Sequence, residues 1–350
     1  MSIPMRTSAD TVVRAVPTRR QLLRGAIENG LLRPGPDATY ADGDDARWMA
    51  VDWPSMTRRV TVLGRELNVV DTGTPTTSSS GTSGGGPPLL FVHGLGGCWQ
   101  NWLLNIPEFM GAHRVVAPDL PGFGESAPPA EGISISGYGK VLDALCDELG
   151  VDGPVVVGNS MGGFVGAELA LAFPTRVERL VLISAAGLSI EHYHREPLLT
   201  GARVWAFSAT WLGARGRAVV ARPRLRRVGM QLLVRYPEKL SASLTYELAR
   251  GTGTPGFVPA LKALLSYSFR DRLEGIEVPV LVVWGRNDML VPRGDAREYV
   301  RLIGANARRE MFEDTGHLAM LERPSRFNAL LTAFIAGERA PESAVEGVSA

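Results

Sequence analysis

Residues 155–163, Val-Val-Val-Gly-Asn-Ser-Met-Gly-Gly, decide the fold of this chain. The three valines predict a short strand buried on both faces, and a helical pattern begins at Phe164. Between them stands Gly-x-Ser-x-Gly, the pattern of a tight strand-to-helix turn that projects a serine oxygen outward. A serine hydroxyl is a poor nucleophile and needs such a position beside a base, so Ser160 is the predicted nucleophile. The alternative is structural, because serine is also a preferred helix N-cap.

The Gly-x-Ser-x-Gly pattern occurs a second time, in Gly81-Thr82-Ser83-Gly84-Gly85. This copy lies in the low-complexity stretch 73–87, which we interpret as a flexible surface loop. No predicted strand precedes Ser83 and no predicted helix follows it, whereas Ser160 has both neighbours. The context therefore favours Ser160.

Short, continuous apolar runs recur along the chain and are typical of strands buried on both faces of a parallel sheet. They lie at residues 89–92, 115–117, 155–157, 180–183 and 280–283. Helical patterns, for example 141–145 and 164–169, separate them, and this alternation predicts a mostly parallel, doubly wound α/β sheet. A β-hairpin of residues 60–62 and 67–70, turned at Gly64-Arg65, precedes these strands.

One interval breaks this alternation, because residues 187–272 are too long for a simple crossover and have a mostly helical pattern. We interpret them as a helical cap inserted between two strands of one core. The predicted organisation is an N-terminal extension (1–55), the first part of the core (56–186), the cap (187–272), the second part of the core (273–337) and a flexible tail (338–350). The sequence assigns no role to the extension.

The composition limits the class of protein. Hydrophobic residues make up 45% and charged residues 21% of the 350 residues, as in a soluble globular protein. The net charge of +1 gives no electrostatic reason for binding nucleic acid. The two cysteines, Cys98 and Cys146, form no Cys-x-x-Cys pattern. We therefore expect neither a disulfide framework nor a metal site, and a reducing cytoplasm fits best.

The sequence contains no clear membrane or export segment. No apolar stretch reaches the roughly 18 residues of a membrane-spanning helix. The pair Arg19-Arg20 resembles a twin-arginine export signal, but residues 25–30 contain a charge and no apolar core. We therefore expect a short amphipathic helix there, in a cytoplasmic protein.

A glycine-rich turn, His93-Gly94-Leu95-Gly96-Gly97, follows the predicted strand 89–92. Such a turn can cradle a phosphate, but the G-x-G-x-x-G spacing and a suitably spaced acidic residue are missing. Together with the Ser160 turn, it is better interpreted as an oxyanion hole in which the Leu95 and Met161 amides are the donors. We expect His93 to hold the loop rather than to take part in chemistry.

The acid and the base are predicted from position and chain order. Asp288 lies just past the strand 280–283, on the edge where parallel sheets place active sites. His317 lies in a loop, and the order Ser160, Asp288, His317 is the one expected for this architecture. His317 would act as the base, and Asp288 would fix its tautomer. Asp314 is a rival acid, but it is only three residues from His317.

The other histidines are weaker candidates for the base. His113 precedes its strand and so lies at the wrong end of the sheet. His192 and His194 stand at the entrance of the cap and could face the pocket.

Together these motifs resemble the α/β-hydrolase superfamily, in its branch of helical-capped esterases, lipases and carbon–carbon bond hydrolases. The matching segments span roughly residues 88–337 and are HGLGG at 93–97, DLPGFGES at 119–126, GNSMGG at 158–163, WGRND at 284–288 and DTGH at 314–317. The resemblance implies an α/β-hydrolase fold with an inserted helical cap. It also implies an architectural role for Asp119 in the DLPGFGES loop.

Single positions bear on the branch within this superfamily. Ser160 departs from haloalkane dehalogenases and epoxide hydrolases, whose pattern has aspartate there. GNSMGG resembles the hydrolases that cleave ring-opened aromatic diketones. The short HGLGG loop and Leu318 after His317 are closer to esterases and monoacylglycerol-type lipases.

The predicted cap has an unusual charge balance. Between Arg203 and Lys239 there are eight arginines and one lysine against one acid, Glu238, with apolar residues interleaved. This pattern is typical of a solvated basic face over an apolar one, or of peripheral contact with an anionic membrane or amphiphile. No nucleic-acid-binding motif accompanies it.

Gly94, Trp99 and Trp102 are predicted to bind substrate beside Cys98, although core packing explains the tryptophans equally well. We expect hydrolysis of a small-molecule, lipophilic carboxylic ester through an acyl-enzyme, with no cofactor. The alternatives are carbon–carbon bond hydrolysis of ring-cleavage diketones and a cofactor-free perhydrolase. A ligand receptor without turnover is a further alternative, against which the complete set of nucleophile, base and acid argues.

Overall fold

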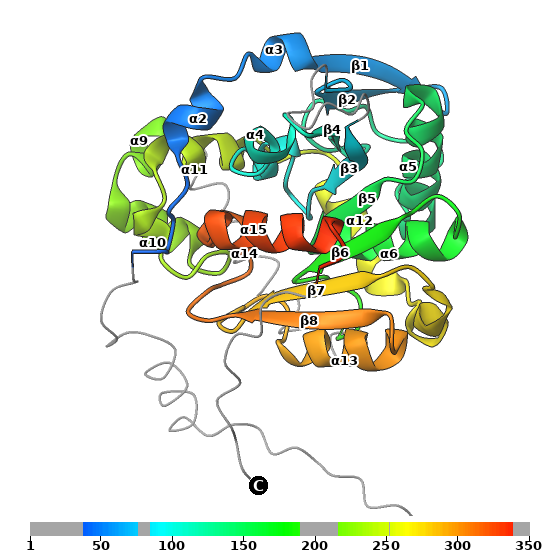
Figure 1. The fold of residues 1–350 in the computed structure, drawn as a ribbon. Coiled ribbons are helices and arrows are strands. Elements are labelled where there is room, and N and C mark those ends of the chain that lie inside the picture. Colours follow the sequence, from blue (N-terminus) through cyan, green and yellow to red (C-terminus); the bar gives the residue numbers. More distant parts are fainter. Residues whose placement is uncertain (1–37, 76–84, 190–215, 252, 339–350) are drawn as a thin grey trace, which may run out of the picture. The chain divides into compact units, whose positions relative to one another are not determined.

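An eight-stranded sheet forms the centre of the protein, whose computed structural model describes residues 38–75, 85–189, 216–251 and 253–338 (Figure 1). The strands are β1 (Thr57–Val62), β2 (Arg65–Asp71), β3 (Gly86–Val92), β4 (His113–Pro118), β5 (Val155–Asn159), β6 (Arg179–Ile183), β7 (Val280–Gly285) and β8 (Ala307–Phe312). Their order in the sheet is β1-β2-β4-β3-β5-β6-β7-β8. The pairs β1–β2 and β2–β4 are antiparallel, and every other neighbouring pair is parallel. The predicted mostly parallel α/β sheet is confirmed.

The parallel strands form where the sequence has continuous apolar runs. Val155, Val156 and Val157 are fully buried because both faces of the sheet are covered. Successive residues of a strand enter two separate cores, so that Val156 packs on one side and Val157 on the other. Each of the five predicted strand runs lies in a strand.

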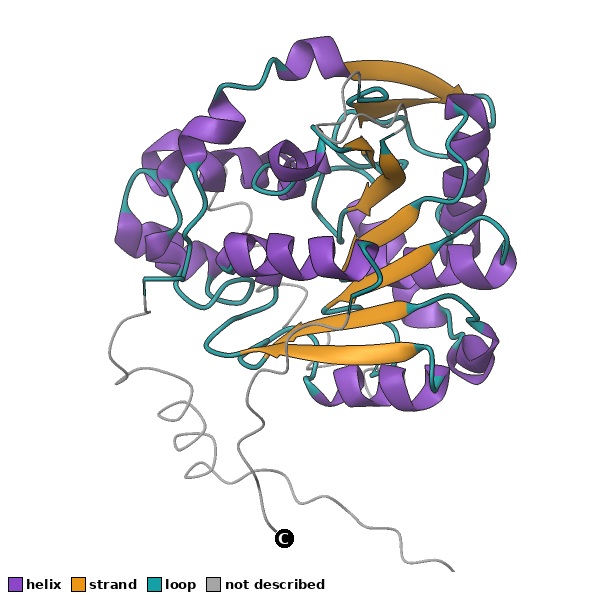
Figure 2. Ribbon diagram, in the orientation of Figure 1, coloured by secondary structure: helices purple, strands orange, loops and turns teal. Residues whose placement is uncertain are grey.

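Helices lie on both sides of this sheet (Figure 2). One core includes residues of α5 (Ile135–Leu149), α6 (Met161–Ala172), α12 (Phe257–Ser266) and α13 (Gly294–Ile303). The other includes residues of the 3-10 helix η2 (Trp99–Trp102), α4 (Ile106–Phe109), α14 (Ala319–Glu322) and α15 (Pro324–Ile335). The predicted helical patterns at 141–145 and 164–169 lie within α5 and α6.

The register brings the carboxyl ends of four strands to one edge of the sheet. Val92 of β3 pairs with Gly158 of β5. Ile183 of β6 pairs with both Asn159 of β5 and Val283 of β7. The turns that follow these strands therefore adjoin one another, and three of them carry the motifs of the candidate site.

Three details of the sheet differ from the prediction. The hairpin turn is Leu63-Gly64 rather than Gly64-Arg65, because both of these residues take positive φ (49° and 73°) and β2 already begins at Arg65. The predicted loop 73–87 ends earlier because β3 begins at Gly86; residues 76–84 lie outside the described ranges. Strand β8 was not predicted, because its sequence ARREMF has no apolar run at this half-buried edge position.

The predicted cap lies in the connection between β6 and β7. Its described part, from residue 216 to 272, contains no strand, and its helices include α12 and the start of η5 (Arg270–Gly275). The others are α9 (Arg217–Val220), α10 (Pro223–Met230), η3 (Pro237–Lys239), α11 (Ala242–Leu248) and η4 (Ala249–Gly251). Residues 190–215, which include His192 and His194, lie outside the described ranges. The helical character agrees with the sequence pattern, while the division into core and cap stays a prediction.

Part of the predicted N-terminal extension belongs to the folded unit that begins at Asp37. It contains α2 (Asp45–Met49) and α3 (Trp53–Met56), and Trp48 is buried in a core. The export-like pair and the tail beyond residue 338 lie outside the described ranges. Within those ranges, no helix combines the length and the apolar character needed to cross a bilayer.

Candidate active site

Ser160 lies on a tight turn between β5 and α6. Its backbone angles are φ 54° and ψ −118°, a conformation that costs a non-glycine residue about 1–3 kcal/mol. A Cβ atom added at Gly158 would lie 2.3 Å from the Gly162 carbonyl oxygen, and one at Gly162 would lie 2.1 Å from that of Val92. Backbone contacts on both sides of the serine therefore require the glycines of the Gly-x-Ser-x-Gly pattern.

Backbone hydrogen bonds hold this turn in its strained conformation. The Ser160 N–H donates to the Ile183 carbonyl (2.9 Å), and the Ser160 carbonyl accepts from Ala186 (3.1 Å) and Phe164 (3.2 Å). Ser160 stands at the N-cap position of α6, but its side chain accepts no capping hydrogen bond. The N-cap alternative is therefore not supported, because the hydroxyl is not used for the cap.

The glycine-rich turn after β3 packs directly against the serine. A Cβ atom added at Gly94 would lie 3.1 Å from the Cβ of Ser160. Met161 is the first residue of α6, where helical N–H groups have no acceptor within the helix. Among the described residues, neither the Leu95 nor the Met161 N–H has a protein acceptor. Both predicted oxyanion donors are thus free to bind a ligand oxygen.

His93 and His113, the two described histidines other than His317, have structural contacts. His93 is fully buried, its Nε2 accepts from the Leu120 N–H (2.9 Å), and burial lowers its pKa, which keeps the ring neutral. His93 therefore joins the turn to the loop after β4, as predicted. His113 is the first residue of β4 and so lies at the end of the sheet away from the candidate site. Its Nδ1 is 2.9 Å from the Pro87 carbonyl oxygen.

Asp288 and His317 form a buried pair. The distance between His317 Nδ1 and Asp288 Oδ2 is 2.8 Å, and the side chains are 3% and 0% exposed. The other oxygen of Asp288 accepts from the N–H groups of Leu290 (2.8 Å) and Val291 (3.0 Å). The carboxylate is thus fixed by its own loop, and it directs the imidazole with Nε2 away from it.

The rival acid, Asp314, is bonded to different residues. It accepts from Arg235 Nε (3.0 Å) and from the Tyr236 hydroxyl (3.0 Å). These contacts are made by Arg235 and Tyr236, in the segment after α10. The structure therefore brings His317 to Asp288 and not to Asp314.

Asn159 connects the serine turn to the histidine loop and was not predicted from the sequence. Its Nδ2 donates to the carbonyl oxygens of His317 (3.3 Å) and Ile183 (3.2 Å). The His317 N–H in turn donates to the Leu233 carbonyl (2.9 Å). His317 is thereby held from both sides, by the residue before Ser160 and by the segment after α10.

Glu322 lies behind the histidine loop and was also missed by sequence reasoning. It is fully buried, and it accepts from the N–H groups of Gly316 (2.9 Å), Leu318 (3.2 Å) and Arg235 (2.8 Å). Burial raises its pKa to about 6, although the hydrogen bonds to the carboxylate oppose this rise. The available signal was a single acid at the end of the apolar run 318–321.

Tyr40, from the predicted N-terminal extension, completes this network. Its hydroxyl donates to Glu322 Oε2 (2.8 Å) and accepts from the Tyr236 N–H (2.9 Å). Its ring packs edge-on against the ring of Tyr236, with centroids 5.1 Å apart, and the Arg323 guanidinium lies 5.1 Å from its centroid. A segment more than 250 residues away in sequence therefore supports the loop that carries His317.

The two tryptophans predicted to bind substrate make core contacts. Trp102 is fully buried and stacks on Phe91, with centroids 4.8 Å apart. Trp99 is 7% exposed, and its ring lies 5.0 Å from that of Trp53. The Trp99 N–H donates to Asp119 (2.8 Å), in agreement with an architectural role for that carboxylate. Core packing accounts for both rings, and their contact with substrate stays a prediction.

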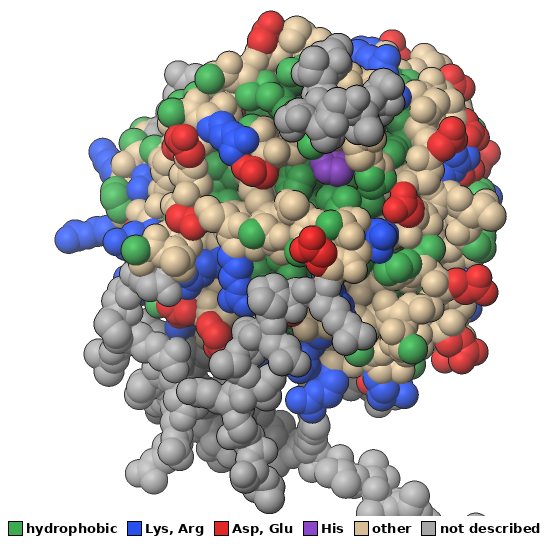
Figure 3. Space-filling view, in the orientation of Figure 1, with side chains coloured by type: hydrophobic (Ala, Val, Ile, Leu, Met, Phe, Trp, Pro, Cys, Tyr) green, Lys and Arg blue, Asp and Glu red, His purple; other side chains and the backbone are tan. Residues whose placement is uncertain are grey.

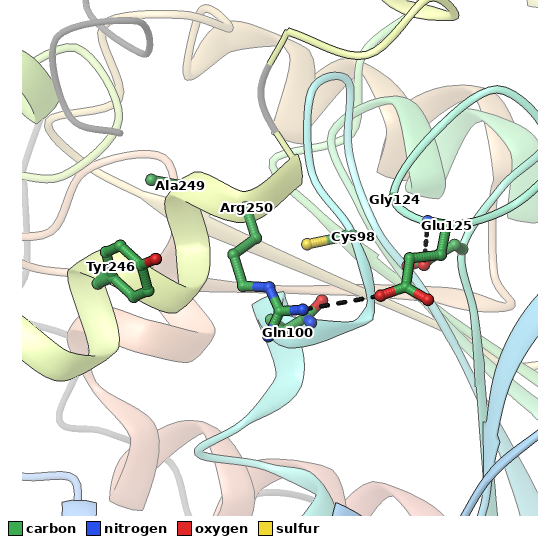
Figure 4. Close-up of a pocket in the computed structure, with 8 residues that line it drawn as sticks. Cys98, Gln100, Gly124, Glu125, Tyr246, Ala249 and Arg250 are labelled. Atoms are coloured by element: carbon green, nitrogen blue, oxygen red, sulfur yellow. Dashed lines mark hydrogen bonds and ion pairs between the residues drawn. The ribbon is translucent and has the colours of Figure 1, made fainter. Parts of the chain in front are cut away.

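A pocket of about 300 Å³ lies beside the glycine-rich turn, between α11–η4 and the loop after β4 (Figure 4). Arg250 crosses it, with nitrogens 3.1 Å from Glu247 and 3.7 Å from Glu125. Burial raises the pKa of the Cys98 thiol well above its usual range, so this cysteine is not a ready nucleophile. The pocket is lined by Cys98, Gln100, Asp119, Gly124, Glu125, Tyr246, Ala249 and Arg250.

Comparison with known proteins identifies a family and several relatives. A sequence profile of the alpha/beta hydrolase fold matches residues 87–324. The 2-hydroxy-6-oxo-2,4-heptadienoate hydrolase of Pseudomonas putida is 30% identical over 273 residues, which are 73% of this chain and 91% of that protein. The dihydrolipoyllysine-residue acetyltransferase component of the acetoin cleaving system of Cupriavidus necator is 31% identical over 263 residues. That match covers 73% of this chain but only 65% of the relative, so the chain spans less than two thirds of it.

One solved structure is similar to that of this chain. Est816, described as an N-acyl homoserine lactone degrading enzyme, superposes with a TM-score of 0.55 at 25% identity. The match covers 79% of this chain and all of that one.

Proposed function

The chain belongs to the alpha/beta hydrolase fold family, and on this premise we propose that it is a serine hydrolase of carboxylic esters. Ser160 is the nucleophile, His317 the base and Asp288 the acid that orients it. Leu95 and Met161 supply the oxyanion hole. The observation that carries the proposal is the buried Asp288–His317 pair beside the strained Ser160 turn.

In the first half of the reaction, Ser160 Oγ attacks the ester carbonyl carbon while His317 Nε2 accepts the hydroxyl proton. The negative charge that develops on the carbonyl oxygen is stabilised by the N–H groups of Leu95 and Met161. The bond between the carbonyl carbon and the alcohol oxygen then breaks. The alcohol leaves with the proton from His317, and the acyl group remains on Ser160.

In the second half, water attacks the acyl carbon while His317 accepts its proton. The acid is released, and Ser160 regains its proton. Asp288 stabilises the imidazolium at both stages, because its buried carboxylate faces Nδ1 and keeps the basic nitrogen at Nε2.

The choice of an ester draws on Est816, described as degrading an N-acyl homoserine lactone, a molecule that contains a cyclic ester. A lipophilic acyl group is supported by the basic and apolar residues of the predicted cap, which can attract an anionic or amphiphilic molecule.

Initial rates on p-nitrophenyl esters from acetate to palmitate test this proposal. Ser160→Ala should lower kcat by about a millionfold, the loss known for removal of a serine nucleophile in subtilisin. Ser83→Ala is the matched control, since Ser83 stands in the same Gly-x-Ser-x-Gly pattern, and it should retain the full rate. A peak at medium or long chains supports a lipophilic ester, whereas no wild-type turnover on any ester would exclude ester hydrolysis.

Carbon–carbon bond hydrolysis is the second candidate, because a relative whose length is almost fully covered is a 2-hydroxy-6-oxo-2,4-heptadienoate hydrolase. The same residues could add water to the carbonyl carbon of a vinylogous diketone, after which the bond from this carbon to the neighbouring carbon breaks and a carboxylic acid and a dienol are released. Loss of the yellow colour of a ring-cleavage product would identify this activity. Ser160→Ala should abolish it, and Ser83→Ala should not.

A further inference from the structure

Helix α10 carries a basic and apolar outer face. Arg222, its N-cap residue, and Arg224 and Arg227 are exposed. Leu225 is 38% exposed and Val228 67%, which makes them two of the few large hydrophobic side chains exposed in the described part of the chain. None of the three arginines forms an ion pair with any described residue.

The inner face of the helix fixes this outer face in place. Gly229 and Met230 are buried. Arg226 points inward, where its guanidinium donates to the carbonyl oxygens of Val220 and Glu238. The helix is therefore anchored by one arginine, while its other arginines point to the outside.

Other arginines of the predicted cap have acidic partners. Arg235 pairs with Asp314 (3.0 Å), and Arg250 pairs with Glu247 (3.1 Å). Basic side chains, with hydrophobic side chains beside them, lie over α10, at the left in Figure 3. Lys239 and Lys262 are also exposed without an ion pair to described residues, but three such cations, Arg222, Arg224 and Arg227, share helix α10.

We propose that α10 is a docking surface for an anionic lipid bilayer. Arginine near an anionic bilayer strengthens binding by about fivefold per residue, so three unpaired arginines contribute on the order of a hundredfold. Exposed aliphatic side chains between such arginines enter the boundary between headgroups and acyl chains. Leu225 and Val228, three residues apart on the helix, occupy this position.

The composition of this face favours a bilayer over nucleic acid. Single-stranded nucleic acid is bound by aromatic rings on which bases stack, and duplexes by polar side chains that reach base edges. The side chains between the arginines of α10 are aliphatic and would gain nothing from either. A bilayer satisfies both the charges and the apolar groups.

Docking through α10 would bring the candidate active site to the membrane. The helix ends at Met230, and the Leu233 carbonyl three residues later accepts the His317 N–H (2.9 Å). Binding itself requires no turnover, so this proposal can fail or succeed independently of ester hydrolysis.

Co-sedimentation of the full chain with vesicles tests the proposal. We compare equimolar phosphatidylglycerol–phosphatidylcholine vesicles with pure phosphatidylcholine vesicles at low salt. The wild type should partition to the anionic vesicles far more strongly than to the neutral ones. The triple variant Arg222→Gln, Arg224→Gln, Arg227→Gln should bind them on the order of a hundredfold more weakly.

The matched control removes three other exposed arginines that also lack an ion pair with described residues, in and near α13 and β8. Arg293→Gln, Arg297→Gln, Arg309→Gln changes the net charge equally and should bind anionic vesicles as the wild type does. Circular dichroism checks that both variants fold. Equal losses in the two variants, or binding to duplex DNA without binding to vesicles, would overturn the proposal.

Discussion

At the scale of single residues, the proposed choice of Asp288 as the acid rests on contacts that only the fold provides. Asp288 and Asp314 both precede His317 in the chain, and either could reach it by sequence distance. The structure gives Asp288 two N–H donors on one oxygen and the imidazole on the other. Asp314 instead binds Arg235 and Tyr236. The two carboxylates therefore have different partners, and we propose that only Asp288 acts on the base.

Substitution of these two acids separates the roles. Asp288→Asn should lower kcat on the best ester by on the order of 10⁴-fold, because the amide no longer holds the productive tautomer of His317. Asp314→Asn should change kcat by less than about tenfold, since it contacts neither the base nor the nucleophile. Steady-state kinetics of both variants measure this difference, and a larger loss for Asp314→Asn contradicts the assignment.

Glu322 adds a second prediction at this scale, on stability against pH. Its pKa is raised to about 6 by burial, from an ordinary value of 4.5. The folded state therefore holds this proton more tightly than the unfolded state does. The resulting stabilisation is complete below pH 4.5 and is lost as the pH rises through 6, by about 2 kcal/mol.

Urea unfolding of the wild type and of Glu322→Gln from pH 4.5 to 7 measures this contribution of Glu322 to the free energy of unfolding. The free energy of unfolding of the wild type, relative to the variant, should fall by about 2 kcal/mol over this range. A constant difference between the two proteins would mean that the carboxyl titrates as it does in the unfolded chain.

At the scale of elements, the serine turn depends on close contact between α6 and the end of β3. A Cβ atom at Gly162 would lie 2.1 Å from the Val92 carbonyl oxygen and 2.6 Å from that of His93. Gly166, one turn later in α6, faces only side-chain carbons, at 3.1 Å from Val156 and 3.3 Å from Leu180. The two glycines thus have similar burial but different neighbours.

Alanine at Gly162 and at Gly166 compares the effect of a clash with backbone atoms with that of a contact with side chains. Gly162→Ala should lower the free energy of unfolding by about 3 kcal/mol and abolish turnover, because α6 must move away from the oxyanion loop. Gly166→Ala should cost less than about 1 kcal/mol, since side chains can shift and alanine favours the helix. Denaturation and ester hydrolysis of both variants check this, and equal effects would contradict it.

The sequence predicted every strand that is buried on both faces, but it missed one edge strand and two short helices. Strand β5 was predicted because three consecutive β-branched valines, followed by a glycine turn, are typical of a strand buried on both faces. Strand β8 was missed because its pattern ARREMF follows an exposed edge. The helices α2 and α3 were missed because they have only five and four residues and are held by tertiary contacts.

At the scale of the whole molecule, the N-terminal segment is part of the support of the candidate site. Ala41 and Tyr40 bond to the backbone and side chain of Glu322, which in turn bonds to both neighbours of His317. Partners 282 residues apart leave no pattern in one sequence. The chain order proposed for Ser160, Asp288 and His317 could be predicted because it follows from the fold class. The contacts of Tyr40 and Ala41 with Glu322 could not.

Tyr40→Phe tests whether the contact between Tyr40 and Glu322 affects catalysis as well as stability. Loss of the hydroxyl leaves Glu322 and the Tyr236 N–H short of a partner, which should lower the free energy of unfolding by about 1–3 kcal/mol. We also expect kcat to fall by about threefold to tenfold with KM unchanged, because the His317 loop is held less firmly.

The matched control is Tyr138→Phe. Tyr138 is also buried, and its hydroxyl donates to the Pro121 carbonyl (3.0 Å) in a different part of the fold. This variant should lose similar stability and keep its kcat. If both variants have the same kcat as the wild type, the N-terminal segment supports only the fold.

Covalent labelling with a fluorophosphonate tests the central claim most directly. Ser160 Oγ should displace fluoride from phosphorus, with His317 accepting the hydroxyl proton. Intact-mass spectrometry should then find one added phosphonyl group on the wild type and on Ser83→Ala, located by peptide mapping at Ser160. Ser160→Ala should remain unlabelled. Labelling of Ser160→Ala at the wild-type rate, or an unlabelled wild type, would contradict the assignment of Ser160 as an activated nucleophile.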